Sequence, residues 1–376
     1  MGLEMKASWL SFCLPRRFRL FAARCIGDLA YLIDDLPKKT VWRMNGDLSI
    51  MFVGDQTSSQ ELLPLFFDEP GDHEFVGQTW PFRLGRKTQS WIEEGTDLVI
   101  CQLSRLHWYR SRAPFKFTIP QMVCQVLPFP GAPDELLAGT RSRDVRRRVN
   151  HLKKSGYDWH FSRSRADYDF FYERLYLPFV RARHGEAADI TAYPWHWDMF
   201  IQKAGGGMVL VTHEGSIVAG SVCLIVDNVC YGVELGVLDG DPQLYQKGIY
   251  AFMVWATASW AMQQGAGFQD LGMSLSLRTN KIFHWKAKLG SQVTRNKYTN
   301  RVLAFSAGRM TPELKKRLNE IGFICEVDQR YYGLVIDGAS DATKERRPQE
   351  SIQHAQKDGL SGVCIVAAGM QPQPYE

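Results

Sequence analysis

The residue with the clearest capacity for chemistry is Glu234, a carboxylate in the middle of the apolar stretch Tyr231–Val237. Its composition and the turn signal that precedes it predict a β-strand. In a regular strand Glu234 would share a face with Gly232 and Gly236, and two glycines would leave room for a substrate beside it. Such a carboxylate can act as a general base that takes a proton from an amine or hydroxyl. It can equally be a buried or edge carboxylate paired with a basic residue.

Two further polar residues accompany the next predicted strand, FQDLG at 268–272. Asp270 lies at the carboxyl end of this strand and Ser274 lies just beyond it, where binding sites of α/β sheets collect. Asp270 could orient an acceptor amine, or it could cap a turn. Ser274 is either a hydrogen-bond donor in a site or a plain turn serine.

The long helix predicted for residues 249–264 begins at a candidate phosphate-binding loop. A helix N-terminus directs unpaired backbone N–H groups at its surroundings, and its dipole favours negative charge. Gly248 would let the backbone approach a phosphate, or would only relieve a crowded turn, and Lys247 would add a charge. Lys286, on a helix predicted for 279–289, could contact a donor phosphate or an anionic acceptor, or could lie on a solvated face.

The largest charge feature is a basic helix predicted for residues 134–155. It could bind the phosphates of a donor, a tRNA or a lipid-linked sugar diphosphate, or it could be an ordinary solvated face. The formal net charge of the whole chain is only +5, which fits an anionic ligand but does not indicate a stable nucleic-acid partner. The basic residues are Arg141, Arg143, Arg146, Arg147, Arg148, Lys153 and Lys154.

These residues require a mixed sheet flanked by helices to bring them together. Strands and helices alternate in the second half of the chain, which is typical of α/β folds. In the first half, a turn at residues 45–47 predicts a hairpin, and Pro178 is expected to kink the helix that contains it. The expected strands are 41–54 (a hairpin), 97–103, 117–127, 208–213, 216–226, 229–237, 268–272, 291–299, 301–307 and 331–336; the other expected helices are 166–184, one after Pro194, and 311–320.

The cysteines and the N-terminal segment limit the class of protein. None of the eight cysteines forms a CxxC pair or has a histidine at zinc-site spacing, so we expect a reduced, cytoplasmic protein without a metal. Four of them, Cys124, Cys223, Cys230 and Cys364, occupy apolar runs as small hydrophobic residues do. Residues 1–36 lack the roughly 20 consecutive apolar residues of a membrane-spanning helix. They are expected to form a partly buried helix or to rest on a membrane surface.

Three segments, taken in order, resemble the GNAT acyltransferase superfamily. Gln246-Lys247-Gly248-Ile249 enters the long helix where that family has its pyrophosphate loop. Phe268–Ser274 resembles the family's strand that ends in Asp, an apolar residue, Gly and a small polar residue. Asn280 and the stretch Trp285–Gly290 resemble the aromatic-Lys signature of the branch that contains Fem-type peptidoglycan aminoacyltransferases and cellulose-cluster acetyltransferases.

The resemblance implies a GNAT-like mixed sheet flanked by helices, with two GNAT-like halves in tandem. It also implies transfer from acetyl-CoA or another acyl-CoA by direct attack, without a metal, and a strand before the loop that diverges from its neighbour. Ser274 would then donate a hydrogen bond to the leaving thiolate. The implied catalytic residues are Glu234, Asp270 and Ser274, and the implied donor-binding residues are Gln246, Lys247, Gly248, Ile249, Asn280 and Lys286.

The loop departs from the usual GNAT pattern at two positions. Tyr245 stands where the pattern has Arg or Gln, and Tyr250 stands where it has Gly or Ala, so Tyr250 is expected to crowd the phosphate cradle. Some Fem-like members take the acyl group from aminoacyl-tRNA, which gives a second interpretation: a tRNA-dependent transferase acting on a peptidoglycan precursor. A third is a GNAT-shaped binding module without catalysis. Tyr193, Trp195 and Trp197 either line an acceptor pocket or form a core cluster.

We therefore expect three regions along the chain. Residues 1–160 would form an α/β domain, a candidate degenerate GNAT copy, and residues 161–337 would form the acyltransferase domain. Residues 338–376 would be a polar extension, partly disordered. The expected acceptor is a small molecule or a cell-envelope precursor, and membrane-surface contact is expected only through residues 1–36.

Overall fold

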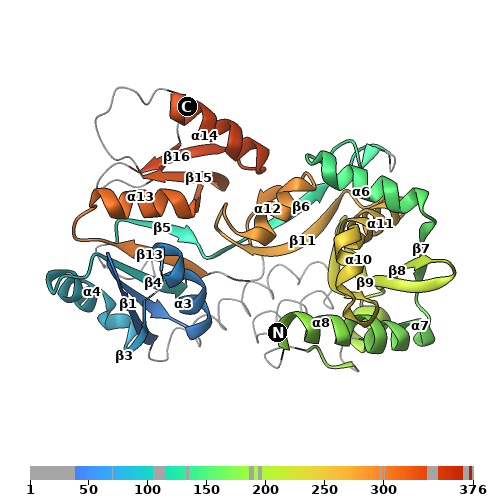
Figure 1. The fold of residues 1–376 in the computed structure, drawn as a ribbon, viewed down its shortest axis with the longest axis horizontal. Coiled ribbons are helices and arrows are strands. Elements are labelled where there is room, and N and C mark those ends of the chain that lie inside the picture. The colour runs from blue at the N-terminus through green and yellow to red at the C-terminus, as the bar shows by residue number, and fades with distance from the viewer. Residues whose placement is uncertain are drawn as a thin grey trace. The chain divides into compact units, whose positions relative to one another are not determined.

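The computed structural model divides the chain into two compact units (Figure 1). Among the described residues, unit 1 holds 125–272 and 285–292, and unit 2 holds the rest. The chain passes from one unit to the other within strands β6 (Met122–Pro128), β11 (Phe268–Leu275) and β12 (Gln292–Thr294) and within helix α12 (Lys281–Lys288). The structure describes residues 39–69, 71–104, 115–132, 135–185, 190–193, 197–296, 299, 301–336, 346–366 and 372–374.

Unit 1 is built on a mixed sheet with the strand order β12-β6-β11-β10-β9-β8-β7. The strands from β7 to β10 pair antiparallel, and β11 pairs with β10 in parallel. Tight turns with positive φ at Glu214 and at Asn228 join the antiparallel strands. The strands are β6 (Met122–Pro128), β7 (Tyr157–Ser162), β8 (Gly207–His213), β9 (Ser216–Val226), β10 (Val229–Val237), β11 (Phe268–Leu275) and β12 (Gln292–Thr294).

Helices cover both faces of this sheet. Helix α11 packs against β8 and β9, and the π-helical segment η4 packs against β9 and β10. Gly236 of β10 faces η4 whereas its neighbour Val237 joins the α11 core, so the two helices lie on opposite faces. The helices are α6 (Arg143–Lys154), α7 (Arg165–Phe170), η4 (Phe171–Tyr176), α8 (Leu177–His184), η6 (Trp197–Lys203), η7 (Leu238–Gly240), α10 (Pro242–Lys247), α11 (Ile249–Gln263) and α12 (Lys281–Lys288).

The core of unit 1 surrounds α11, which is apolar on all sides. Such a helix is stable only when it is covered all round. The sheet covers one side of it, and buried Val145, Val149 and Leu152 of α6 cover another. Ser142 caps α6 by accepting from the N–H of Val145, and Gly156, with φ of 82°, follows its end.

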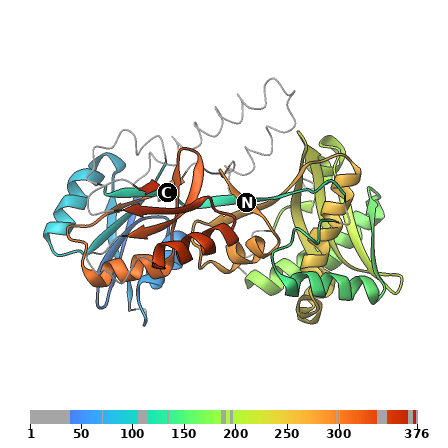
Figure 2. The ribbon, with the colours of Figure 1, turned by 90° about the horizontal axis from the view of Figure 1, so that it is seen from above.

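Unit 2 contains a six-stranded sheet with the order β3-β1-β2-β4-β13-β5. The predicted hairpin is β1 with β2, and β2 pairs with β4 in parallel. One face packs on α3, η1 and α13, and the other packs on α4; Figure 2 shows α13 in orange along this sheet. The elements are β1 (Lys39–Asn45), β2 (Ser49–Gly54), α3 (Gln56–Leu62), η1 (Leu63–Phe66), β3 (His73–Thr79), η2 (Pro81–Arg83), α4 (Leu84–Glu93), β4 (Leu98–Ser104), β5 (Phe117–Pro120), β13 (Arg301–Ser306) and α13 (Pro312–Ile321).

The C-terminal part of the chain is more ordered than its composition predicts. A second sheet of unit 2 has the order β14-β15-β16-β17, and α14 packs on β15 and β16. Ala355 and Cys364 are fully buried there, so a few apolar residues within a polar stretch are enough to dock it. The elements are β14 (Ile324–Val327), β15 (Arg330–Ile336), α14 (Arg346–Lys357), β16 (Gly362–Val366) and β17 (Gln373–Pro374).

Three other details differ from expectation. The strand expected at 117–127 is two strands, because β5 pairs with β13 whereas β6 belongs to the sheet of unit 1. Most of the loop expected at 238–248 is helical, with Asp241 capping α10 through the N–H of Gln243. The expected domain boundaries at residues 160 and 337 do not coincide with those of the two units, which are assembled from separate stretches of chain.

The N-terminal segment 1–36, for which a membrane-surface contact was expected, lies outside the described residues. Within the described part of the chain, no helix is long and apolar enough to cross a membrane.

Candidate active site

Strands β10 and β11 pair only briefly and then separate. Their parallel ladder joins residues 229–231 to residues 268–270, although β10 continues to Val237. Beyond Tyr231 the ladder of β10 continues with β9, its antiparallel neighbour on the other side. The β11-facing edge of β10 therefore presents backbone groups that an extended ligand can pair with. This divergence is the feature that the family resemblance implied.

A β-bulge in β10 determines where Glu234 points. The register against β9 shifts between Gly232 and Glu234. Cys230 and Leu235 both pack into the α11 core although they are five residues apart, so the bulge has reversed the alternation of faces. Glu234 consequently lies on the η4 face of the sheet. The expectation that it shares a face with Gly232 is wrong, because that expectation assumed a regular strand.

The second glycine beside Glu234 serves packing. A Cβ on Gly236 would lie 2.5 Å from the backbone carbon of Leu175 in η4. Gly236 is therefore required for the close approach of the helix rather than for substrate. At Gly232, by contrast, the nearest atom to an added Cβ is the Ser221 hydroxyl oxygen at 3.8 Å, so this position is open.

The carboxylate of Glu234 is half-buried and hydrogen-bonded. The Thr191 hydroxyl donates to Oε1 of Glu234 over 3.0 Å, and the Tyr176 hydroxyl also bonds to this carboxylate. Burial raises the pKa of Glu234 to about 7, and the two hydroxyl groups oppose part of that rise. A carboxylate with this pKa exchanges a proton readily near neutral pH, which is the property of a general base.

Asp270 lies on the same face of the sheet as Glu234. Its neighbour Gln269 is the register partner of Cys230, which belongs to the α11 core, so Asp270 points to the opposite, η4 face. Asp270 is buried, and its Oδ1 accepts from the N–H of Gly272 over 2.7 Å. It therefore forms the turn that the sequence allowed as its alternative role, at the point where β11 leaves β10.

Lys286 reaches this turn from α12. It is buried, and its Nζ donates to the carbonyl of Gly272 over 3.0 Å. The solvated helix face that the sequence allowed for Lys286 is thus wrong. Asp270 accepts from the N–H of Gly272 while Lys286 donates to its carbonyl, so the two side chains fix the backbone where β11 leaves β10.

The α10–α11 junction has the geometry expected of an anion-binding loop. Gly248 has φ of 96°, in the left-handed region that favours glycine, and it ends α10 and begins α11. Gln246 and Lys247 are exposed, whereas Gly248 and Ile249 are buried. At the start of α11 the N–H of Ala251 already bonds to the carbonyl of Gly248, so Ile249 and Tyr250 hold the N–H groups that this helix N-terminus offers to an anion.

The two tyrosines of the loop pack against aromatic residues of neighbouring helices. The ring of Tyr250 meets Trp285 edge-to-face at 4.6 Å, and Tyr245 stacks on Phe179 at 5.6 Å. The Tyr250 ring is therefore held by α12, and the expected crowding of the loop by this residue is not observed. Burial raises the pKa of both hydroxyls.

The basic helix α6 supports this loop. Arg148 donates from Nη1 to the carbonyl of Gln246 over 2.5 Å and from Nε to Asp144 over 2.7 Å. Arg141 donates to the carbonyls of Ala287 and Ser291. Several of the arginines thus bind backbone carbonyls, which neither the phosphate-binding nor the solvated-face interpretation anticipated. Arg147 remains 79% exposed in its side chain and is bonded to Asp144.

Two of the predicted site residues belong to unit 2. Ser274 is buried in β11. Asn280 accepts from the N–H groups of Ile282 and Phe283 and so caps the start of α12. The structure therefore groups Glu234, Asp270, Lys286 and the loop at Gly248 within unit 1, and assigns Asn280 a capping role.

The aromatic residues near Glu234 form a packed cluster. Tyr193 and Trp197 both pack on Tyr168, at 5.1 and 5.0 Å between ring centroids. The guanidinium of Arg165 lies over both of their rings, at 4.8 and 4.7 Å. This matches the core-cluster alternative for Tyr193 and Trp197. Trp195 lies outside the described residues.

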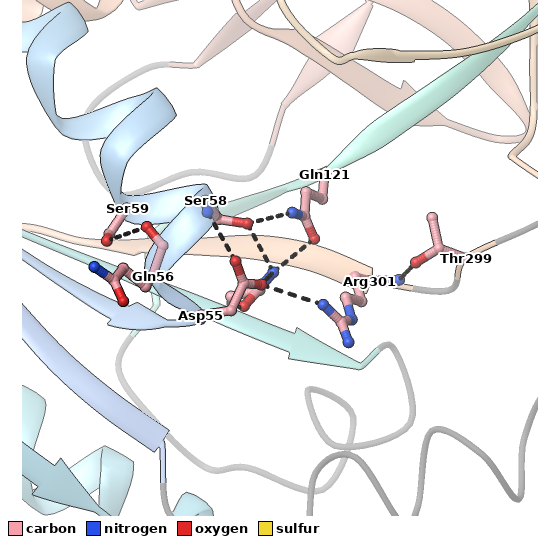
Figure 3. A network of polar contacts seen from close by, with 8 residues as sticks. Asp55, Gln56, Ser58, Ser59, Gln121, Thr299 and Arg301 are labelled. Atoms are coloured by element: carbon pink, nitrogen blue, oxygen red, sulfur yellow. Dashed lines mark hydrogen bonds and ion pairs between the residues drawn. The ribbon is translucent and has the colours of Figure 1, made fainter. Parts of the chain in front are cut away.

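In unit 2, side chains bridge the carboxyl end of the parallel pair β2–β4. At the carboxyl ends of β2 and β4, the Gln102 amide accepts from the N–H of Asp55 over 2.9 Å and donates to its carboxylate. Ser58, Gln121 and Arg301 complete this network (Figure 3). Side chains of the protein occupy the place where a crevice of this kind would bind a ligand.

Sequence reasoning missed the side chains that hold Glu234 and the loop. Thr191, Tyr176 and Arg148 were not chosen as site residues, because their contacts join segments far apart in the chain. One local signal existed: Tyr168, Tyr172 and Tyr176 recur at a spacing of four residues, which places them along one helix face. No group of three or more His, Cys, Asp or Glu side chains that could hold a metal occurs within the described ranges.

Comparison with known proteins identifies the central part of the chain. Residues 139–286 match a family model described as an acetyltransferase (GNAT) domain, as the sequence predicted. No curated protein matches the sequence. Among solved structures, the chain is similar to FemX, with 12% identity over 68% of this chain and 80% of that one and a TM-score of 0.40.

Two further structures show the same distant likeness. L-PGS from Bacillus licheniformis has 13% identity over 82% of this chain and 96% of that one, with a TM-score of 0.38. A GCN5-related N-acetyltransferase from Sphaerobacter thermophilus has 11% identity over 69% of this chain and 71% of that one, with a TM-score of 0.32.

Proposed function

The chain belongs to the GNAT superfamily through residues 139–286, and on that premise we propose that it transfers an acyl group from an acyl-CoA to an amine or hydroxyl acceptor. An acetyl group is the simplest cargo, and the chemistry is assigned to unit 1. The proposal rests above all on one observation. A carboxylate with a pKa of about 7, Glu234, lies on the strand whose ladder with β11 ends at Tyr231.

In the proposed reaction the acceptor attacks the thioester carbonyl carbon directly. Glu234 takes the proton of the attacking nitrogen or oxygen as the new bond to carbon forms. The carbon–sulfur bond breaks, and coenzyme A leaves as a thiolate that is then protonated to the thiol. Beyond Tyr231, the β11-facing edge of β10 pairs with no strand among the described residues and is suited to holding the acyl carbonyl by a backbone N–H. No covalent acyl-enzyme is needed.

The donor phosphates would bind at the start of α11. The backbone N–H groups there favour an anion, and exposed Gln246 and Lys247 border the same end of the helix. Lys286 and Asp270 would then act indirectly, by fixing the Gly272 backbone where β11 leaves β10. Ser274 as a donor to the thiolate and Asn280 as a donor contact remain predictions.

A Fem-like transferase that uses aminoacyl-tRNA and acts on a peptidoglycan precursor is the second candidate. The observation that favours it is the set of exposed basic side chains on α6, among them Arg147, beside the α10–α11 junction. A tRNA donor would make binding strongly dependent on salt concentration. A non-catalytic module would bind the donor without any requirement for Glu234.

The test of the proposed function is thiol release from acyl-CoA in the presence of candidate amines and hydroxyl acceptors. Free coenzyme A is measured with a thiol reagent, and the acylated acceptor is identified by mass spectrometry. The proposal requires release that depends on both the acceptor and Glu234. Acylation of the acceptor with aminoacyl-tRNA as donor, detected by mass spectrometry, without thiol release from any acyl-CoA would support the second candidate, and donor binding without any transfer would support the module.

A further inference from the structure

A row of tyrosines holds residues 190–193 across the η4 face of the unit 1 sheet. Tyr172 donates from its hydroxyl to the carbonyl of Thr191 over 2.9 Å, and Tyr168 donates to the carbonyl of Tyr193 over 3.2 Å. The hydroxyl of Tyr176 accepts from the N–H of Thr191 over 3.0 Å. Both backbone groups of Thr191 are thus bound by tyrosine hydroxyls.

The fixed residue is the one that touches the carboxylate. The Thr191 side chain is buried, and its hydroxyl donates to Oε1 of Glu234 over 3.0 Å. Tyr172 and Tyr176 both belong to η4, a π-helical segment. Segments of this rare kind occur frequently at functional sites. The two tyrosines of η4 therefore fix the Thr191 backbone, and this fixes the Thr191 hydroxyl beside Glu234.

We propose that Thr191 is a positioning residue, held by Tyr172 and Tyr176, that sets the orientation and proton affinity of Glu234 for catalysis. The inference rests on the proposed function, because it assigns a role in proton transfer. A hydroxyl that donates to a carboxylate stabilises its ionised form, so Thr191 opposes the effect of burial. It also leaves Glu234 with one preferred direction for the lone pair that receives the proton.

The tyrosine hydroxyls around Glu234 do not titrate in the same range. Burial raises the pKa of Tyr172 and of Tyr176 above the ordinary tyrosine value, so both stay neutral near pH 7. The charge of Arg181 in α8 opposes part of this rise at Tyr172. In the segment 190–193, burial also raises the pKa of Tyr193, whose hydroxyl donates a hydrogen bond to Asp169. These tyrosines therefore add no titration of their own near pH 7, and the Glu234→Gln variant identifies the titration of Glu234.

The experiment compares Thr191→Val with Thr191→Ser in the full chain. The Val variant keeps the shape and removes the hydroxyl, and the Ser variant restores it. We measure kcat/KM against pH with acyl-CoA and, separately, the titration of Glu234 by carbon-13 NMR of glutamate-labelled protein. The Glu234→Gln variant identifies the signal, and thermal melting verifies that each variant is folded.

The expected result is a rise in the Glu234 pKa and a matching move of the acid limb of kcat/KM to higher pH in Thr191→Val. That corresponds to a loss of roughly threefold to tenfold at pH 6.5 that disappears near pH 9. Thr191→Ser should behave as the wild type. Wild-type titration and wild-type pH profile in a folded Val variant would overturn the inference. If the wild type transfers nothing, the proposed function fails, and the NMR titration still decides whether Thr191 controls Glu234.

Discussion

Tyr231 and Asp270 are the last residues at which strands β10 and β11 pair. On β10, the bulge just past this pair turns Glu234 onto the η4 face. On β11, Asp270 itself forms the turn at Gly272. The end of one short ladder thus determines the location of both carboxylates that the sequence had singled out.

Replacing Glu234 by Gln should abolish transfer without abolishing donor binding. Removal of a general base costs about a hundredfold to ten-thousandfold in rate, whereas the amide keeps the shape of the carboxylate and still accepts from Thr191. The exposed Glu173, on the same π-helical segment as Tyr176, offers a matched control as Glu173→Gln. Steady-state rates and a donor titration measure both effects. Equal rates for Glu234→Gln and the wild type would remove Glu234 from the mechanism.

The same residue should make stability depend on pH. The folded-state pKa of Glu234 is raised to about 7 from 4.5, so between these values the folded protein binds more protons than the unfolded chain. The free energy of unfolding then falls as the pH rises through this window. Relative to Glu234→Gln, the wild type should lose up to about 3 kcal/mol between pH 4 and pH 8. Urea unfolding at both pH values measures this, and parallel pH profiles for the two proteins would refute the assignment.

Two glycines of β10 should differ in their tolerance of a methyl group. Gly236→Ala places a Cβ 2.5 Å from the backbone of Leu175 and should destabilise the protein by about 1–3 kcal/mol. Gly232→Ala meets only the Ser221 hydroxyl at 3.8 Å and should change stability by no more than about 0.5 kcal/mol. Equilibrium unfolding of the pair provides the comparison. A costly Gly232→Ala together with a neutral Gly236→Ala would mean that the bulge is placed wrongly.

Arg148 and Arg147 should separate the two candidate donors. Arg148 binds the Gln246 carbonyl, so Arg148→Ala should weaken acyl-CoA binding at least about threefold by releasing the loop. Arg147 bonds only to Asp144 among the described residues, and Arg147→Ala should leave acyl-CoA affinity unchanged. With a tRNA donor both variants should bind more weakly, and each should reduce the salt slope by about one. Binding titrations at several salt concentrations distinguish these patterns.

The sequence predicted the second half of the fold well because its elements are locally encoded. Apolar runs separated by turn residues predicted the strands from β8 to β10. Glycines at its two ends predicted the long helix α11, which begins after Gly248. The segment between residues 56 and 93 was not predicted at all. Its helices α3 and α4 are short, and β3 is a partly exposed edge strand that pairs only with β1, so local signals there are weak.

The sequence predicted which residues belong to the candidate site better than it predicted how they are arranged. Glu234, Asp270 and Gly248 could be chosen from type and position. The bulge that reverses the face of β10 depends on how β9 and β10 align, and no single strand contains that information. The Thr191 contact spans 43 residues and the Arg148 contact spans 98, so both exist only after the chain has folded.

The central claim is that unit 1 binds an acyl-CoA through the start of α11. The direct measurement is a thermal-shift titration with coenzyme A, acetyl-CoA and longer acyl-CoAs for the wild type, Gly248→Ala and Gly265→Ala. Both glycines have positive φ, of 96° and 81°, but only at Gly248 does an added Cβ meet another side chain, Arg148 at 3.0 Å. At a hundred times the dissociation constant, a ligand adds about 2.7 kcal/mol of stability.

We predict a shift of a few degrees for the wild type and for Gly265→Ala, largest with one acyl length, and little or none for Gly248→Ala. The absence of a shift in the wild type with every thioester would contradict acyl-CoA as the donor. An equal shift in all three proteins would contradict the location of its binding site.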